Sequence, residues 1–339
     1  MQRRKLLMGI GSSLAPVASG SLTASRASAQ GGLPIVIGCQ DSPDWLLYAA
    51  RDLKLFERAG LAPTFVKFDG GPPMIAAAQN GSIDVASVGS VSFLMGLSQG
   101  VDWRMIGINP EGAYSQGIVV RKDSGIVRPM ELREKRIGVF KGSMADYGLM
   151  MILRTHGIAR DQVTILYMSP EEQYQALETR RIDAAATREP WLQKMVHGLH
   201  GRVIAREGDV GIYTNVDSYS VRRDWLQTHR PTAVRFLQAL LMAYDVVEKD
   251  PAAAIRAWAD DMGIKVAWAE EIYENVPPPL IHQWANPHYT YSLVKNGSFE
   301  RRLAFLAGYL FSERIITQQV DMSGVMDVSI ILDAAKGRR

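Results

Sequence analysis

Two groups of residues combine types that can bind an anion. The first is Gly142, Ser143 and Met144. They follow an apolar run at residues 137–140 and begin an amphipathic segment, which places them where a strand would pass into a helix. Free backbone N–H groups and the positive end of the helix dipole attract negative charge at such a position. Gly142 lets a ligand approach the backbone, and Ser143 can donate its hydroxyl or serve only as the N-cap.

A second group ends another apolar run, residues 183–187. It consists of Thr187, Arg188 and Glu189. An arginine or a glutamate at this place could contact a charged group on a ligand. Ligands of open parallel sheets lie beyond the carboxyl ends of the strands. We therefore expect both groups at one cleft.

Strands and helices must alternate to hold these groups in place. Residues 163–168 form a further apolar run, and Ser169 with Glu172 makes a capping box before the next helix. Strand, helix, strand, helix, strand at this spacing requires parallel strands joined by crossover helices, because a tight hairpin cannot join parallel neighbours. This stretch predicts one lobe of an α/β protein.

The preceding residues repeat the pattern. Strands are predicted at 33–38, 61–68, 84–88 and 105–108. Residues after their ends are further candidate ligand contacts: Gln40, Asp41, Trp45, Gly71, Gly89, Ser90 and Glu111. Trp45 could stack on a ligand or pack in the core. Glu111 could pair with a ligand ammonium or lie in a solvated loop.

The chain is expected to pass between two lobes twice. Residues 117–121 lead into the second lobe, and residues 212–222 return, with Tyr219 placed to face the cleft. Two crossings predict a two-strand hinge about which the lobes close around a ligand. The expected division is residues 30–121 with 222–339 as lobe 1, and residues 122–221 as lobe 2.

A family resemblance rests on these segments. The run KRIGVFKGS and the later run ARDQVTILYMSPEEQYQALETRRIDAAATREPW resemble the second lobe of periplasmic substrate-binding proteins of ABC importers. Residues 76–100 resemble the matching first-lobe segment. The closest branch is the nitrate, sulfonate and taurine one, which also includes binders of thiamine-pyrimidine precursors. The resemblance implies a type II two-lobe fold, each lobe a mostly parallel sheet flanked by helices.

The first 29 residues have the features of an export signal. A basic start at residues 3–5 precedes a moderately apolar run, and residues 27–29 form a small-residue cleavage site. The Arg3-Arg4 pair resembles a twin-arginine signal, with the general secretory route as the alternative. We expect cleavage after Ala29 and a periplasmic location.

Removing this segment changes the charge of the chain. The segment carries four basic residues and no acid, so the formal net charge of +3 becomes −1 for residues 30–339. Such a balance gives no reason to expect nucleic acid or an acidic membrane as partner. Cys39 is the only cysteine, which excludes an internal disulfide.

Spacings typical of catalysis are missing from the sequence. There is no GxSxG elbow and no Walker sequence, and His197 and His200 have no cysteine or acid at metal-ligand spacing. We therefore expect no enzyme, no metal and no cofactor.

These features together predict a monomeric carrier. It would bind a small organic sulfonate or taurine-like anion or zwitterion between its lobes and deliver it to an inner-membrane ABC permease. The acids near the cleft favour a zwitterion or a neutral heterocycle over bare nitrate. The alternative is a periplasmic binder or enzyme acting on a pyrimidine-like heterocycle. A sensory module that feeds a receptor remains a third possibility.

Overall fold

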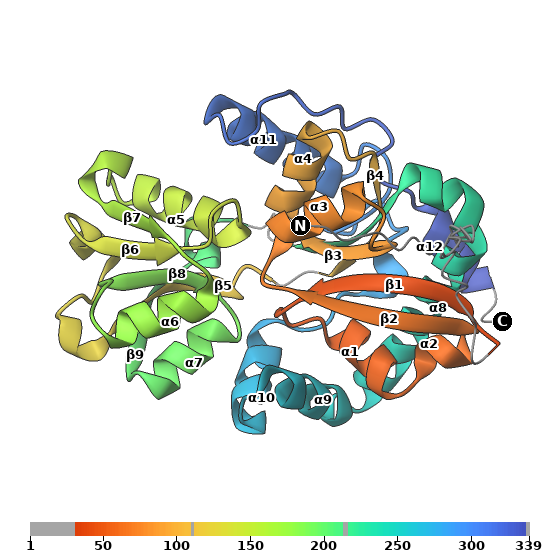
Figure 1. The fold of residues 1–339 in the computed structure, drawn as a ribbon, viewed down its shortest axis with the longest axis horizontal. Coiled ribbons are helices and arrows are strands. Elements are labelled where there is room, and N and C mark those ends of the chain that lie inside the picture. The colour runs from red at the N-terminus through yellow and green to blue at the C-terminus, as the bar shows by residue number, and fades with distance from the viewer. Residues whose placement is uncertain (1–30, 110–111, 213–215, 337–339) are drawn as a thin grey trace, which may run out of the picture.

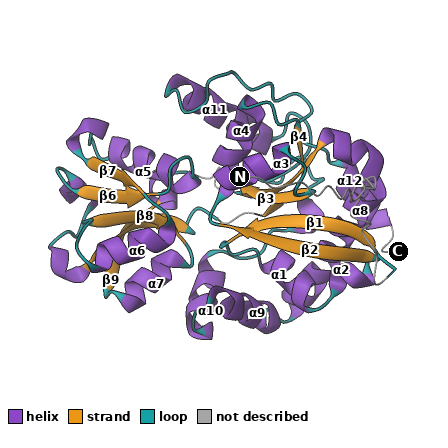
Figure 2. Cartoon of the chain, viewed as in Figure 1, coloured by secondary structure: helices purple, strands orange, loops and turns teal. Residues whose placement is uncertain are grey.

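Two α/β lobes lie side by side in the computed structural model, which describes residues 31–109, 112–212 and 216–336 (Figure 1). Helices cover both faces of the sheet in each lobe (Figure 2). The expected signal segment and Glu111 lie outside the described residues. No helix within the described ranges has the length and apolar character needed to cross a membrane.

The first lobe is built on a five-stranded sheet with the order β2-β1-β3-β10-β4. Its strands are β1 (Leu33–Gln40), β2 (Leu61–Phe68), β3 (Val85–Gly89), β4 (Trp103–Asn109) and β10 (Asp217–Arg222). β1 runs parallel to β2 and β3, whereas β10 is antiparallel to both β3 and β4. Every residue of β3 and β4 is buried, as expected for strands covered on both faces.

Most helices of the described residues belong to this first lobe, where they pack on the sheet or on one another. They are α1 (Trp45–Asp52), α2 (Leu55–Arg58), α3 (Gly71–Gln79), α4 (Ser90–Ser98), α8 (Arg223–Lys249), α9 (Ala252–Met262), α10 (Val266–Asn275), α11 (Ser298–Ser312) and α12 (Ser329–Lys336). α8 bends at His229, two residues before Pro231, because proline removes a helical hydrogen bond and clashes with the preceding turn.

The second lobe repeats the topology with the strand order β7-β6-β8-β5-β9. Its elements are β5 (Gln116–Arg121), β6 (Arg136–Val139), α5 (Met144–Thr155), β7 (Thr164–Tyr167), α6 (Pro170–Glu178), β8 (Ala184–Arg188), α7 (Trp191–Gly198) and β9 (Gly201–Arg206). β6 is parallel to β7 and β8, and β5 is antiparallel to β8 and β9. The parallel β-α-β-α-β core predicted from the sequence is confirmed.

Short 3-10 helices complete the described chain. They are η1 (Lys122–Ser124), η2 (Pro129–Leu132), η3 (Arg160–Gln162), η4 (Glu207–Val210) and η5 (Ile281–Gln283). The serine caps are confirmed: the Ser143 side chain accepts from the Asp146 N–H, and Ser169 forms its capping box with Glu172. Each cap satisfies a backbone donor that has no partner within its helix.

The strand pairing differs from the expected lobe division. β5, expected to end the first lobe, pairs in the second sheet, and β10, expected to end the second lobe, pairs in the first. The described residues between β4 and β5, and between β9 and β10, contain no strand, so the two strands expected as a hinge lie inside the sheets. Strand-like alternation marks a half-buried strand but does not say which sheet it joins.

Candidate ligand-binding cleft

A small cavity lies between the lobes, at the strand ends that face one another. The first lobe lines it with Gln40, Gly70, Gly71, Gly89, Ser92 and Asp217, and the second with Gln116, Ser143, Met144, Ala145 and Arg188. Both lobes contribute polar side chains, so a ligand held here would contact both at once.

The start of α5 forms one wall of the cavity. Ser143 caps this helix and donates its hydroxyl to the Phe140 carbonyl at 2.7 Å, so its side chain is fixed. Gly142 has a φ of +71°, a conformation that favours glycine, and its N–H donates to the Asp146 carboxylate at 3.0 Å. The first-turn N–H groups after Ser143 lack acceptors within the helix and provide positive potential for an anion.

Arg188 is the basic side chain among the described residues that line the cavity. It extends from the carboxyl end of β8 and is only 7% exposed. Its Nε donates to the carbonyl oxygen of Asp41 at 2.7 Å, and Nη2 donates to that of Asp69 at 3.1 Å. Both acceptors belong to the first lobe, so this guanidinium bridges the lobes as well as facing the cavity.

Asp217 is the acidic counterpart. Its carboxylate is 2% exposed and accepts hydrogen bonds from Gln40 Nε2 on both oxygens at 2.9 Å, and from Ser42 Oγ at 2.9 Å. A Cβ placed on Gly89 would lie 3.3 Å from Asp217 Oδ1, so the glycine leaves room beside the carboxylate. Neutral donors thus hold a buried carboxylate at the cavity surface.

Sequence reasoning missed five lining residues: Gly70, Ser92, Gln116, Ala145 and Asp217. Gln116 and Asp217 are the first residues of β5 and β10, the antiparallel strands. The amino end of an antiparallel strand lies beside the carboxyl ends of its neighbours, and the sequence pattern does not show in which direction a strand runs. Ser92 lies in the first turn of α4 and donates to the Gly142 carbonyl across the lobes at 3.2 Å.

Trp45 packs in the core, which was the alternative to stacking on a ligand, and the prediction that Tyr219 faces the cleft is wrong. Trp45 is fully buried, donates its Nε1 to the Val276 carbonyl at 2.6 Å, and packs edge-on against Trp258. Tyr219 is also fully buried, and its hydroxyl donates to the Asp44 carboxylate while its ring packs against Phe236. Both rings lie in the core of the first lobe, because large apolar surfaces are most stable away from water.

Glu189 and Ser90 lie near the cleft but outside the cavity lining. Glu189 is buried, accepts from the Gln193 N–H at 3.1 Å, and lies 3.4 Å from Arg206 Nη1. Burial raises the pKa of the Glu189 carboxyl to about 7, against the opposing effect of Arg206. Ser90 donates its hydroxyl to the Val216 carbonyl at 3.2 Å.

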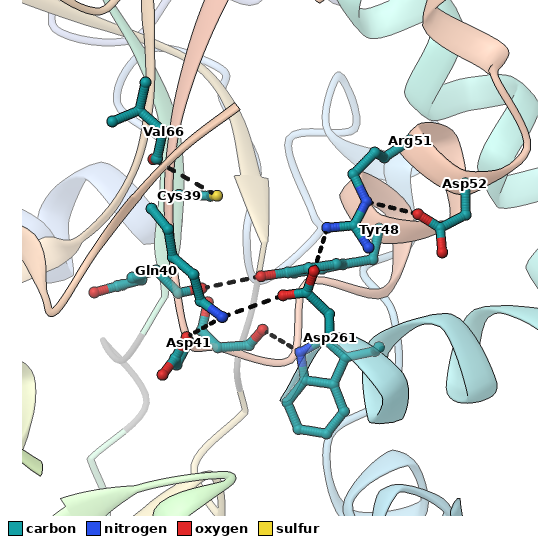
Figure 3. Close-up of polar contacts among 11 residues, drawn as sticks. Cys39, Gln40, Asp41, Tyr48, Arg51, Asp52, Val66 and Asp261 are labelled. Carbon is teal, nitrogen blue, oxygen red and sulfur yellow. Dashed lines mark hydrogen bonds and ion pairs between the residues drawn. The ribbon is translucent and has the colours of Figure 1, made fainter. Parts of the chain in front are cut away.

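Asp41 contributes its carbonyl rather than its carboxylate to the cleft. The carboxylate oxygen Oδ1 lies 2.9 Å from Lys67 Nζ, and neither residue is among those that line the cavity (Figure 3). Gly142 is not among the lining residues, and its carbonyl accepts a hydrogen bond from the Ser92 hydroxyl. Of the predicted contacts, the cavity brings together Gln40, Gly71, Gly89, Ser143, Met144 and Arg188.

Groups that could support other chemistry lie elsewhere. The Cys39 thiol is buried, contacts the Val66 carbonyl at 3.8 Å, and does not line the cavity (Figure 3). Burial raises the pKa of this thiol to about 11, which opposes formation of a nucleophilic thiolate. Within the described ranges, no group of three histidine, cysteine or acidic side chains is arranged to hold a metal ion.

Two mixed sheets with one antiparallel strand each and a cleft between them define the type II periplasmic-binding-protein fold, and solved structures confirm this class. The alkanesulfonate-binding protein SsuA from Xanthomonas axonopodis pv. citri, bound to MOPS, matches with a TM-score of 0.74 and 24% identity over 88% of this chain and 99% of its own. The desulfurization enzyme DSZB shares the fold, with a TM-score of 0.64 and 14% identity over 91% of this chain and all of its own. The fold therefore occurs in binding proteins and in an enzyme.

The chain belongs to the NMT1-like family, whose model matches residues 46–262. A Bacillus subtilis relative, provisionally named an aliphatic sulfonates-binding protein, is 28% identical over 88% of this chain and 87% of its own length. The taurine-binding periplasmic protein of Escherichia coli is 25% identical over 62% of this chain and 65% of its own length. The resemblance to the sulfonate and taurine branch is thus confirmed.

Proposed function

We propose that this chain is the exported solute-binding component of an ABC importer and that it captures a taurine-like organic sulfonate in the interlobe cavity. The observation that carries the proposal is the pairing of opposite charges in one small cavity. Arg188 and the start of α5 offer donors and positive potential, and Asp217 offers a carboxylate. A sulfonate joined to an ammonium group complements both.

The buried carboxylate argues against a bare anion. Asp217 lines the cavity and accepts hydrogen bonds from Gln40 and Ser42. A second negative charge brought into a site of low dielectric would be repelled strongly. An ammonium group on the same ligand turns this repulsion into attraction. The proposed ligand class is therefore a zwitterion rather than nitrate or a simple alkanesulfonate.

The residues that line the cavity favour a carrier over an enzyme. The lining offers hydrogen-bond donors and a carboxylate that already accepts from Gln40 and Ser42. The Cys39 thiol lies outside the lining, with its pKa raised by burial. A pyrimidine-like heterocycle is the alternative ligand, since the amides of Gln40 and Gln116 can also pair with ring nitrogens and carbonyls.

Export and delivery are part of the same proposal. Residues 1–29 would direct the chain to the periplasm and be removed after Ala29, and the mature protein would act as a monomer with an inner-membrane permease. The named periplasmic location of the taurine-binding relative supports this location. Mass spectrometry of the mature amino terminus tests the cleavage site, and copurification with a cross-linked permease tests the partner.

Binding measurements decide the ligand class. Calorimetry with taurine, ethanesulfonate, nitrate and cytosine should give taurine the lowest Kd, with stoichiometric binding and the ligand recovered unchanged. Tightest binding of ethanesulfonate or nitrate would overturn the zwitterion assignment. Tightest binding of cytosine would favour the heterocycle reading, and conversion of any ligand to product would show an enzyme.

A further inference from the structure

We infer that Arg188 couples ligand binding to lobe closure, through two carbonyl acceptors on the first lobe, and that an ion-pair chain outside the cavity holds one of these acceptors in place. The inference rests on the proposed function in taking the cavity as the ligand site. It adds a role for residues that do not touch a ligand. It also predicts that substitutions on the outer surface of the first lobe change ligand affinity.

The hydrogen bonds of Arg188 support its role in coupling ligand binding to lobe closure. Its acceptors, the carbonyls of Asp41 and Asp69, directly follow the ends of β1 and β2. Two separate nitrogens of one planar guanidinium reach these neighbouring strand ends, while the side chain also lines the cavity. The fork of donors in arginine suits this task, since the compact lysine ammonium cannot reproduce its geometry. A ligand sulfonate at Arg188 would therefore meet a guanidinium already fixed to the opposite lobe.

A chain of ion pairs holds the loop that contains Asp41 (Figure 3). Asp41 Oδ1 lies 2.9 Å from Lys67 Nζ, which lies 3.2 Å from Asp261 Oδ2. Asp261 Oδ1 lies 2.6 Å from Arg51 Nη1, and Arg51 Nε lies 2.6 Å from Asp52 Oδ1. The chain links the residue after β1 to β2, α9 and α1. Because a network of charges is held more firmly than an isolated surface pair, it fixes the loop that offers the Asp41 carbonyl.

The charges along the chain are mutually supporting. Partial burial opposes protonation of Lys67, yet its ion pairs with Asp41 and Asp261 raise its pKa, so the ammonium persists. The Lys67 side chain is 47% exposed and does not line the cavity. A change at Lys67 therefore removes no ligand contact, and it can act on the ligand through the position of Asp41 and the bonds of Arg188.

A ligand shifts a two-state equilibrium only by its difference in affinity for the two states. The bonds from Arg188 to the first lobe exist only when the lobes are together, so they contribute to that difference. Weakening them lowers the closed population and with it the apparent affinity, even when every ligand contact is kept. A variant that keeps the positive charge at position 188 but loses these bonds therefore distinguishes a bridging role from simple charge attraction.

The test uses the full mature chain with a fluorescence pair. Labels are attached at Asp161→Cys on the second lobe and Gln319→Cys on the first, both exposed positions. The buried Cys39, with its raised pKa, stays unlabelled. Energy transfer then reports closure, and calorimetry with taurine reports affinity. The variants are Arg188→Lys and Lys67→Met.

Both variants should move the two readouts together. Arg188→Lys keeps the charge but should weaken taurine binding by about tenfold or more and leave the lobes further apart at a matched degree of saturation. Lys67→Met should weaken binding by roughly two- to fivefold with a smaller loss of closure. The matched control is Arg136→Lys, which disturbs an arginine paired with Asp183 inside the second lobe and should change neither readout.

Each remaining outcome overturns a stated part of the inference. If Arg188→Lys weakens binding while closure at saturation is unchanged, Arg188 is a ligand contact only. If Lys67→Met binds taurine as the unsubstituted chain does, the ion-pair chain has no role. If the unsubstituted chain binds none of the four ligands, the proposed function fails. The bridge is then tested by small-angle scattering without ligand, where an unchanged radius of gyration in Arg188→Lys refutes it.

Discussion

Replacing Asp217 with asparagine tests the charge pairing on which the ligand assignment depends. Asparagine keeps the size of the side chain and one oxygen for the donors Gln40 and Ser42, and it removes the negative charge from the cavity surface. The Gln40 amide can rotate to offer its oxygen to the new amide group. The fold should therefore tolerate the change, and the effect should fall on the ligand.

The magnitude follows from the bond that is lost. A hydrogen bond between charged groups contributes about 1.5–3 kcal/mol, so the Kd for taurine should rise by roughly 10- to 150-fold. The Kd for ethanesulfonate, which has no ammonium group, should fall or stay the same because a repulsive charge is gone. The ratio of the two Kd values, measured by calorimetry at neutral pH, isolates the charge effect from any general loss of folded protein.

The matched control is Asp44→Asn. Asp44 is also a buried acid of the first lobe, and it accepts from Tyr219 and Ser87, but it does not line the cavity. Its replacement should lower the melting temperature and leave the taurine-to-ethanesulfonate ratio unchanged. An equal loss of both ligands in Asp217→Asn would refute the reasoning, and so would a ratio that shifts as much in Asp44→Asn.

Three further substitutions separate the site from its scaffold. Ser143→Phe should fill the cavity beside the start of α5 and abolish the ligand-induced rise in melting temperature, and an unchanged rise would remove Ser143 from the site. Trp45→Ala should lower the free energy of unfolding by about 3–5 kcal/mol in denaturant titrations, whereas Trp45→Phe should leave the Kd for taurine unchanged; a changed Kd would restore Trp45 as a ligand contact. Because burial raises the pKa of Glu189 from 4.5 to about 7, the folded protein keeps a proton that the unfolded chain has lost. The free energy of unfolding should therefore fall between pH 4.5 and 7 by on the order of 3 kcal/mol, and Glu189→Gln should flatten this dependence; an equally steep profile would contradict the assignment.

Local signals in the sequence located the polar helix starts and the parallel strands. Ser143 and Ser169 act as predicted because capping depends on a few consecutive residues. Gly71, Gly89 and Arg188 line the cavity as predicted because the ends of parallel strands meet at one edge of a sheet. These features need no knowledge of distant contacts.

Features that depend on distant contacts could not be predicted. Trp45 is buried because α9 and α10 cover it, and both helices come more than 200 residues later in the chain. The burial of Tyr219 could not be predicted, because alternation separates the two faces of a strand without saying which neighbour covers each face. Gln116 and Asp217 were missed because their strands run against their neighbours, and strand direction follows from pairing.

The antiparallel strands also constrain the order in which the chain can fold. All five strands of the second sheet come from the continuous stretch 116–206, so that lobe can complete its sheet from its own residues. In the first sheet β10 lies between β3 and β4, and β4 pairs with no other strand of that sheet. During synthesis, the apolar β4 must therefore wait for residues made after the whole second lobe, a nonlocal pairing of the kind that slows folding. A chaperone that covers β4 in that interval would act on the first lobe and leave the second to fold unaided.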